Sequence, residues 1–167
     1  MTIVLSTTPP WKDIESVYGN PDKDGDRAFD KDWYEENTKL FHLPFTLVAS
    51  WDAARKYQNL RFHRLIGPAL VDALREIGEH YGPSIVKGDL NVLGDALSLR
   101  PMKSSPYLST HSYGISIDLN NHVACWGCEP DTQPEPIVDA FESRGFVWGG
   151  RWDEPYKDPM HFQACRG

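Results

Sequence analysis

The pattern of apolar and polar positions predicts one long helical region in the first half of the chain. Apolar residues recur at intervals of three and four from Phe62 to Tyr81, which is the spacing of one face of an α-helix. Gly82-Pro83 ends this run. Gly67-Pro68 interrupts it, so that the helix either kinks there or gives way to a second helix whose first residue is Pro68. The sequence therefore predicts helical structure over residues 61–82.

Alternation of apolar and polar residues predicts short strands in the second half of the chain. The segments concerned are Leu97–Met102, Ile115–Asn120, Phe146–Trp148 and Met160–Gln163. A short helix over residues 137–141, closed by Gly145, is expected between the second and the third of them. This order of elements behind a helical first half predicts an α+β fold with a mostly antiparallel central sheet flanked by helices.

The first part of the chain offers fewer signals. Residues 1–60 are rich in turn-forming residues, with one short extended segment at Leu43–Val48. Neither a repeat nor a domain boundary is recognisable. We therefore expect a single domain over residues 1–167, with a turn-rich part (1–60), a helical part (61–82) and a sheet (97–163).

Composition and charge narrow the class of protein. The 167 residues are 40% hydrophobic and 25% charged, and 17 basic residues stand against 24 acidic ones, which gives a net charge of −7. An acidic chain is not expected to bind nucleic acid. No apolar stretch of 18 residues occurs, so we expect no membrane insertion. Substrate binding should then depend on the shape of a cleft more than on the overall charge. We expect a monomer.

The segment Ser109–Asp118 carries two potential metal ligands, His111 and Asp118. Seven positions separate them, an odd number that would put the two side chains on opposite faces of an unbroken strand. Gly114, which lies between them, permits a bend that can bring them together. A catalytic zinc site needs a further ligand from elsewhere.

A second segment, Asp158–Gln163, supplies that ligand. His161 and Gln163 alternate with apolar neighbours, as in a short strand with a histidine on its polar face. Pro159 makes the start of this strand irregular, so that Asp158 can lie beside the metal. Two histidines and an aspartate suit zinc and leave a fourth position for water. Asp158 then offers the carboxylate base that zinc hydrolases need.

These two segments resemble zinc peptidases that cut D-amino-acid-containing peptides of bacterial cell walls. The motifs are Ser-x-His-x-x-Gly-x-(small)-x-Asp at Ser109–Asp118 and Asp-x-x-His-Phe at Asp158–Phe162. Residues 146–152 are similar to the Gly-Phe-x-Trp-Gly-Gly-x-Trp segment of that family, and Ser116 stands where the family usually has alanine. The family includes D-alanyl-D-alanine carboxypeptidases and dipeptidases and phage L-alanyl-D-glutamate endopeptidases. It shares its fold with the hedgehog signalling domain.

The resemblance implies a hedgehog/DD-peptidase-like fold and a Zn²⁺ ion held by His111, Asp118 and His161. Asp158 would be the general base, which takes a proton from the attacking water and later passes it to the leaving amine. Arg100 is the candidate for stabilising the oxyanion or for holding a substrate carboxylate.

Two further residues are candidates for substrate contact. Ser109 matches the serine of the family motif and is expected to bind the substrate backbone, the alternative being a turn-forming hydroxyl. Trp148, together with Trp152, flanks Gly149-Gly150 and is expected to form a wall of the cleft, the alternative being a place in the core.

We therefore expect a zinc metallopeptidase that hydrolyses the stem peptide of peptidoglycan. Within the family, an L-alanyl-D-glutamate endopeptidase that acts as a phage endolysin in bacteriolysis is favoured, because no export signal is recognisable. Such a protein stays in the host cytoplasm until its release to the cell wall, or is virion-associated. A D-alanyl-D-alanine carboxypeptidase is the first alternative. The others are a non-catalytic hedgehog-like zinc-binding module and a structural zinc protein, which would need a closed shell of four ligands.

Two other motifs are interpreted as structural. Cys125–Cys128 is a Cys-x-x-Cys motif, which in combination with His122 and Cys165 would suit a structural zinc site, but we expect reduced thiols. Asn20–Asp26 is similar to the start of an EF-hand calcium loop. Lys31 stands where that loop has its bidentate glutamate, so a solvated loop is expected.

Overall fold

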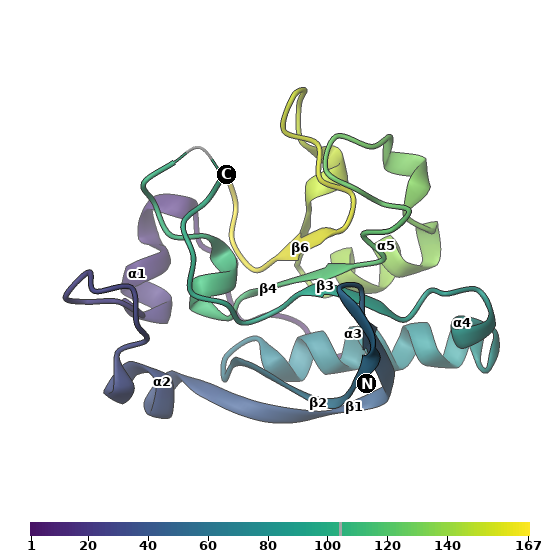
Figure 1. Ribbon diagram of the computed structural model, residues 1–167, viewed down its shortest axis with the longest axis horizontal. Helices are drawn as coiled ribbons and strands as arrows, with labels where there is room; N and C mark the ends of the chain where they lie inside the picture. Colours follow the sequence, from purple (N-terminus) through teal and green to yellow (C-terminus); the bar gives the residue numbers. More distant parts are fainter. Residues whose placement is uncertain (104) are drawn as a thin grey trace.

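A computed structural model describes residues 1–103 and 105–167 of the chain (Figure 1). The strands are β1 (Thr38–Ala49), β2 (Asp52–His63), β3 (Val92–Asp95), β4 (Ser116–Leu119), β5 (Val147–Trp148) and β6 (His161–Gln163). They form one six-stranded sheet in the order β2-β1-β3-β4-β6-β5. Only β1 and β3 are parallel neighbours among these pairs, and the other pairs are antiparallel. The predicted α+β class with a mostly antiparallel sheet is confirmed.

Helices flank this sheet. The α-helices are α1 (Ile14–Tyr18), α2 (Lys31–Asn37), α3 (Gly67–Tyr81), α4 (Ser84–Lys87) and α5 (Glu135–Glu142). The 3-10 helices are η1 (Trp11–Asp13), η2 (Thr110–Tyr113), η3 (Pro130–Thr132) and η4 (Gly149–Arg151). Helix α5 confirms the helix that was predicted over residues 137–141. Among the described residues, no helix is both long enough and apolar enough to cross a lipid bilayer.

Helix α3 begins at Gly67, so the prediction that helical structure starts at residue 61 is wrong. Pro68 lies in the first turn, where its missing N–H group has no partner to lose. Phe62 belongs instead to β2, whose last residue, His63, pairs with Thr38 of β1. The helical spacing continued into the strand because Phe62 and the buried side chains of α3 contribute to the same core.

Strands β1 and β2 form a long hairpin, of which the sequence predicted only a short extended segment at Leu43–Val48. The register of the hairpin shifts between His42 and Leu47, around Pro44, which has no N–H group to donate to the ladder. Strand β2 lies at the edge of the sheet, and most of its first eight side chains are exposed. An exposed strand of this kind has no apolar alternation by which a sequence would reveal it.

The prediction of a strand at Leu97–Met102 is wrong, because β3 ends before this segment, at Asp95. The Asp95 carboxylate accepts hydrogen bonds from the backbone N–H of Ala96 (2.8 Å) and from the hydroxyl of Ser98 (2.9 Å), and these bonds turn the chain out of the sheet. Pro101 forms only an isolated bridge with Leu108. The turn brings residues 96–100 next to the segment that carries His111.

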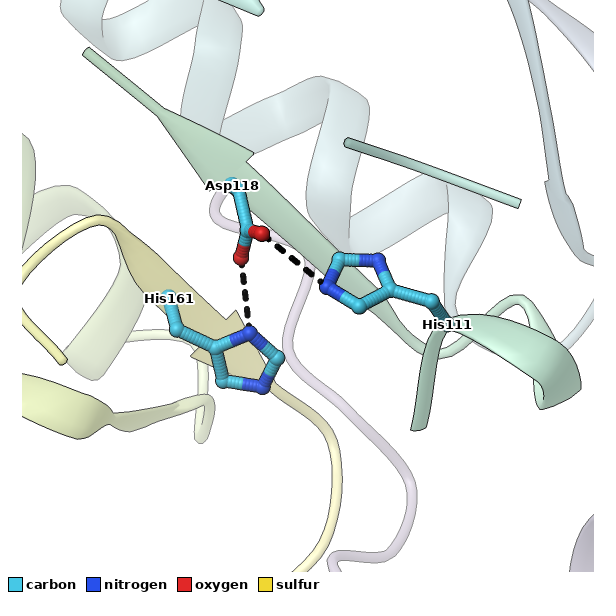
Figure 2. A group of neighbouring side chains, drawn as sticks. All are labelled: His111, Asp118 and His161. Carbon is cyan, nitrogen blue, oxygen red and sulfur yellow. Dashed lines mark hydrogen bonds and ion pairs between the residues drawn. The ribbon is translucent and has the colours of Figure 1, made fainter. Parts of the chain in front are cut away.

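Strand β4 separates the core from the candidate site. Ile115, Ile117 and Leu119 are buried in one apolar core with side chains of α3 and α5, as their alternation predicted. In Figure 2, the side chain of Asp118 extends from β4 toward two histidines that come from other segments. The sheet therefore holds Asp118 over its other face, where neighbouring segments meet.

Candidate metal centre

The three residues that were predicted as ligands lie together in the structure (Figure 2). His111, Asp118 and His161 are buried, and each offers one ligand atom within 4.8 Å of the others. Asp118 and His161 are direct neighbours on β4 and β6, with 2.7 Å between Oδ1 and Nδ1. Nε2 of His111 lies 3.2 Å from Oδ2 of Asp118. Strand pairing places two of the ligands, and the third comes from η2.

Gly114 makes the bend that was predicted between His111 and Asp118. It ends η2 with a φ of 65°, a left-handed conformation that residues with a side chain rarely adopt. Its carbonyl oxygen accepts a hydrogen bond from the backbone N–H of His63 (2.8 Å). A Cβ atom at this position would lie 2.9 Å from that nitrogen, so a side chain here would push η2 away from β2.

The His111 ring is oriented by a backbone carbonyl. Nδ1 lies 2.7 Å from the carbonyl oxygen of Ala96, which only accepts hydrogen bonds, so Nδ1 carries the hydrogen. Nε2 therefore presents a lone pair. This nitrogen is buried without a hydrogen-bond partner, although Oδ2 of Asp118 lies 3.2 Å away. Two acceptor atoms that face each other at this distance repel one another unless a cation lies between them.

The His161 ring is oriented by a side-chain amide. Nε2 of Gln163 donates to the carbonyl oxygen of Cys165 (3.0 Å), so Oε1 of Gln163 is free to accept. Nε2 of His161 lies 3.0 Å from that Oε1 and therefore carries the hydrogen. Thr110 supports the same nitrogen from 3.2 Å, and its hydroxyl donates to Ser116 (2.9 Å). Ser116, which departs from the family's alanine, thus belongs to this hydrogen-bond chain.

The donor set fits zinc. Two imidazole nitrogens and a carboxylate converge, and each ring is held through its other nitrogen by an acceptor, which is the usual support of metal-binding histidines. Three protein ligands leave a fourth position for water or substrate, as in catalytic zinc sites. Neither Gln163 nor the Ala96 carbonyl was predicted from the sequence, although Gln163 shares the polar face of its strand with His161.

The charges of the site are strongly coupled. Burial alone would raise the pKa of Asp118, but the neighbouring His111 and His161 bring it below its usual value. Burial alone would lower the pKa of His161, but Asp118 and Asp158 bring it above its usual value. A proton on Nδ1 of His161 therefore competes with a metal ion for the same lone pair.

Asp158 lies beside the three ligands. It is 6% exposed, and its Oδ1 atom is buried without a hydrogen-bond partner. Its backbone N–H donates to Gly149 (2.9 Å), and its carbonyl oxygen accepts from the N–H of His161 (3.0 Å). Burial raises the pKa of Asp158 to about 6, with a further contribution from Asp118. A Cβ atom on Gly149 would lie 2.5 Å from the carbonyl oxygen of Asp158, so a glycine is needed there.

Arg100 lies near Asp158 and is held by Asp95. The guanidinium donates from Nε to Oδ2 of Asp95 at 3.0 Å, and its positive charge lowers the pKa of Asp158. The same Oδ2 lies 3.7 Å from Nδ1 of His111. Asp95 was not predicted from the sequence, where a carboxylate at the end of a strand is an ordinary turn signal. It connects the arginine with the segment that orients a ligand.

The two residues that were predicted to contact substrate lie differently. The Ser109 hydroxyl accepts a hydrogen bond from the N–H of His111 (3.3 Å) and begins η2, which is the turn-forming alternative. Trp148 is 6% exposed and donates from Nε1 to the carbonyl oxygen of Pro159 (2.7 Å), so it lies in the core beneath the site. Trp152 is partly exposed, and its ring lies 5.6 Å from that of His161. Of the two tryptophans that were predicted to form a wall of the cleft, Trp152 is therefore the one that borders the site.

The two motifs that were interpreted as structural have different outcomes. Cys125 and Cys128 form a disulfide, so the expectation of reduced thiols is wrong for this pair. Cys165 is a buried free thiol, and within the described ranges no group of three potential metal ligands includes a cysteine. The carboxylates of Asp22, Asp24 and Asp26 do come together in one loop, where the last two are exposed. Calcium binding there stays untested.

An open site of two histidines and one aspartate, with a buried carboxylate beside it, is characteristic of metal-dependent hydrolases. The model of a family described as D-alanyl-D-alanine carboxypeptidase matches residues 103–164, which include the three ligands and Asp158. This match supports the family resemblance on which the prediction was based, and it indicates a hydrolase of peptide bonds. No solved structure matches the chain significantly.

Proposed function

We propose that this protein is a zinc-dependent L-alanyl-D-glutamate endopeptidase that hydrolyses the stem peptide of bacterial peptidoglycan. The observation that supports it best is the convergence of the lone pairs of His111 and His161 on Asp118, next to a buried carboxylate without a partner. A peptidase needs both parts, a site for the metal and a base beside it. The family match adds the peptide bond as the group that is cut.

Asp158 is the general base of this proposal. Zinc, when bound by His111, Asp118 and His161, supplies a Lewis acid that polarises the scissile carbonyl and makes water more acidic. Asp158 takes the proton of the attacking water on its free Oδ1 and returns it to the leaving amine. Its pKa of about 6 in the chain alone suits both transfers near neutral pH.

Arg100 has the role of an electrophilic partner. Its side chain is 43% exposed, so its guanidinium is accessible to a bound peptide, and Asp95 pairs with it at 3.0 Å. A fixed guanidinium stabilises the negative charge that develops on the carbonyl oxygen, or binds a substrate carboxylate in a bidentate manner. Trp152, beside His161, provides an apolar wall for the peptide.

A groove lies near the segment that carries His111, but its lining includes neither the three ligands nor Asp158. It has a volume of about 890 Å³ and runs between the N-terminal loops and residues 105–108. Leu108 and Tyr113, which line it, flank the segment that carries His111. The alternative, a D-alanyl-D-alanine carboxypeptidase, is supported by the description of the matching family.

A non-catalytic zinc module of the hedgehog type is the alternative from another class. Asp158 argues against it, because burial of a carboxylate without a hydrogen bond is unfavourable and a binding module has no use for it. All four chemical groups come from one chain, so a monomer is sufficient for the proposed activity. In the cell, we propose a phage endolysin that reaches peptidoglycan when it is released from the host cytoplasm, or that is carried on the virion.

Mass spectrometry of purified muropeptides after digestion tests this proposal. Release of the stem peptide from its D-glutamate onward, with L-alanine left on the muramic acid, is the expected result. Loss of a single terminal D-alanine would establish the carboxypeptidase instead. Intact muropeptides with zinc-loaded protein would contradict a peptidase of either kind. Protein that has been freed of zinc by a chelator is the control, and it should cut nothing until zinc is restored.

A further inference from the structure

The disulfide between Cys125 and Cys128 closes a tight exposed turn, which we call the Cys125–Cys128 turn. Cys125 is exposed and Cys128 partly exposed, so that a reductant can reach the sulfur atoms. The N–H of Cys128 donates to the carbonyl oxygen of Cys125 (3.0 Å), and Gly127 has a φ of 74°. Two residues, Trp126 and Gly127, form the tip of the turn.

One contact of the turn reaches the segment of the general base. The backbone N–H of Gly127 donates to the carbonyl oxygen of Lys157 (2.8 Å), and Lys157 directly precedes Asp158. The Lys157 ammonium also lies 3.9 Å from a carboxylate oxygen of Glu129, the residue that follows the turn. The position of the turn therefore constrains the backbone that carries Asp158.

A second contact reaches the loop that follows Arg100. The ammonium of Lys103 lies 5.6 Å from the centre of the Trp126 ring, a cation–π arrangement. Lys103 follows Arg100 by three residues, and the same loop leads to Ser109 and His111. Trp126 and Gly127 thus contact, from one disulfide-closed turn, both the loop after Arg100 and the loop before Asp158.

We propose that the Cys125–Cys128 disulfide is a redox-sensitive site that responds to dithiols and sets the activity of the neighbouring centre. A thiolate of the dithiol attacks the exposed sulfur of Cys125, and Cys128 leaves as a thiolate that takes up a proton. The second thiol of the reductant then displaces Cys125 from the mixed disulfide. Two electrons and two protons pass to the protein, and the reductant becomes a disulfide.

The oxidised form is the active form in this proposal, which rests on the proposed peptidase function for its effect on catalysis. Reduction removes the cross-link that restricts the turn, so the contacts of Trp126 and Gly127 weaken and Asp158 is held less firmly. None of the three metal ligands lies in the turn, so zinc binding is unchanged. The conformational entropy that a disulfide removes depends on the length of the loop that it closes, and this loop has only four residues. The free energy of ordering the turn after reduction therefore limits the loss of kcat/KM to about 20-fold.

An activity measurement tests the consequence for catalysis. Wild-type protein is treated with dithiothreitol, desalted under nitrogen and assayed for zinc and for muropeptide cleavage. We expect a several-fold fall in kcat/KM with zinc retained, and recovery on reoxidation. The C125S/C128S variant should have the low activity before and after treatment, which also shows that the reagent does not act by removing zinc. C165S, which lacks only the buried thiol, should respond as wild type.

A structural measurement tests the site independently of any activity. Hydrogen exchange at the N–H of Gly127, and at that of Asp158, should be faster in the reduced protein and in C125S/C128S than in the oxidised protein. Equal exchange in the two redox forms, or full wild-type kcat/KM in C125S/C128S, would overturn the inference. If no form cuts muropeptides while exchange responds to reduction, the redox site stands and the proposed peptidase function fails.

Discussion

Asp118 and His161 face each other across β4 and β6, with the carboxylate Oδ1 2.7 Å from Nδ1 of the imidazole. Because the two strands are paired, the distance between these ligands is set by the sheet. The sheet does not set the orientation of the His161 ring, since the side chain can rotate about its own bonds. The partner on its other nitrogen, Gln163, decides which nitrogen faces Asp118.

Removal of that partner should weaken the metal site. The Gln163→Leu substitution keeps most of the side-chain volume but removes the acceptor for Nε2 of His161, so the ring is no longer fixed. We expect zinc affinity to fall by about 10–100-fold, the usual effect of losing such a partner. Competition with a chromogenic chelator measures this. Gln58→Leu, on the exposed β2 strand, is the matched control, and an equal loss in both variants would contradict the assigned role.

Asp95 should matter for turnover through Arg100. Asp95→Asn keeps the shape of the side chain but removes the negative charge that holds the guanidinium at 3.0 Å. We expect kcat/KM for muropeptides to fall by about tenfold, as for about 1.4 kcal/mol of lost transition-state stabilisation. Asp52→Asn is the control, since Asp52 also pairs with an arginine and caps a turn, but far along the hairpin. Unchanged kinetics in Asp95→Asn would exclude a positioning role.

His63 should make the fold sensitive to acid. It is fully buried, accepts a hydrogen bond from the N–H of Leu65 (3.2 Å) and lies 3.2 Å from the carbonyl oxygen of Tyr18. Burial lowers its pKa from 6.5 to about 4. Between these values the unfolded chain binds a proton that the folded chain does not, so the free energy of unfolding falls as pH drops from 6.5 to 4. The total loss is about 3 kcal/mol.

Urea unfolding of metal-free protein at several pH values between 4 and 7 measures this effect. His63→Gln preserves one donor and one acceptor but cannot titrate, so its stability should depend less on pH within that window. His80→Gln, on the exposed face of α3, should retain the wild-type dependence. Parallel pH profiles for wild type and His63→Gln would show that another group is responsible.

The meeting of the three candidate ligands was predictable from sequence because each of them is embedded in a local pattern. The alternation around Asp118 and His161 indicated strands, and Gly114 indicated the bend, and the structure has all three features. The α+β class followed from the order of these patterns. What sequence did not indicate is the register that makes Asp118 and His161 neighbours, because pairing is a property of two segments and not of either one.

The predictions that failed concern places where contacts with other parts of the chain override the local pattern. Residues 97–102 alternate as a strand would, but the Asp95 side chain turns the chain before they begin. The apolar spacing that begins at Phe62 could not separate a strand end from a helix start, since both bury residues in one core. Trp148 ends β5 and is buried, whereas Trp152 follows η4 and is partly exposed, and the local sequence around the two residues does not distinguish these places.

The most direct test of the account compares two variants, Asp158→Ala and His161→Ala, by zinc content and muropeptide cleavage on the same preparations. Asp158→Ala should keep close to one zinc ion per chain, while turnover falls by about 10²–10⁴, the usual contribution of a positioned proton-transfer group. His161→Ala should lose zinc affinity and turnover together, since it removes a ligand. Loss of zinc from a folded Asp158→Ala would make the aspartate a fourth ligand of a closed site. Full activity of Asp158→Ala with zinc bound would equally contradict the mechanism.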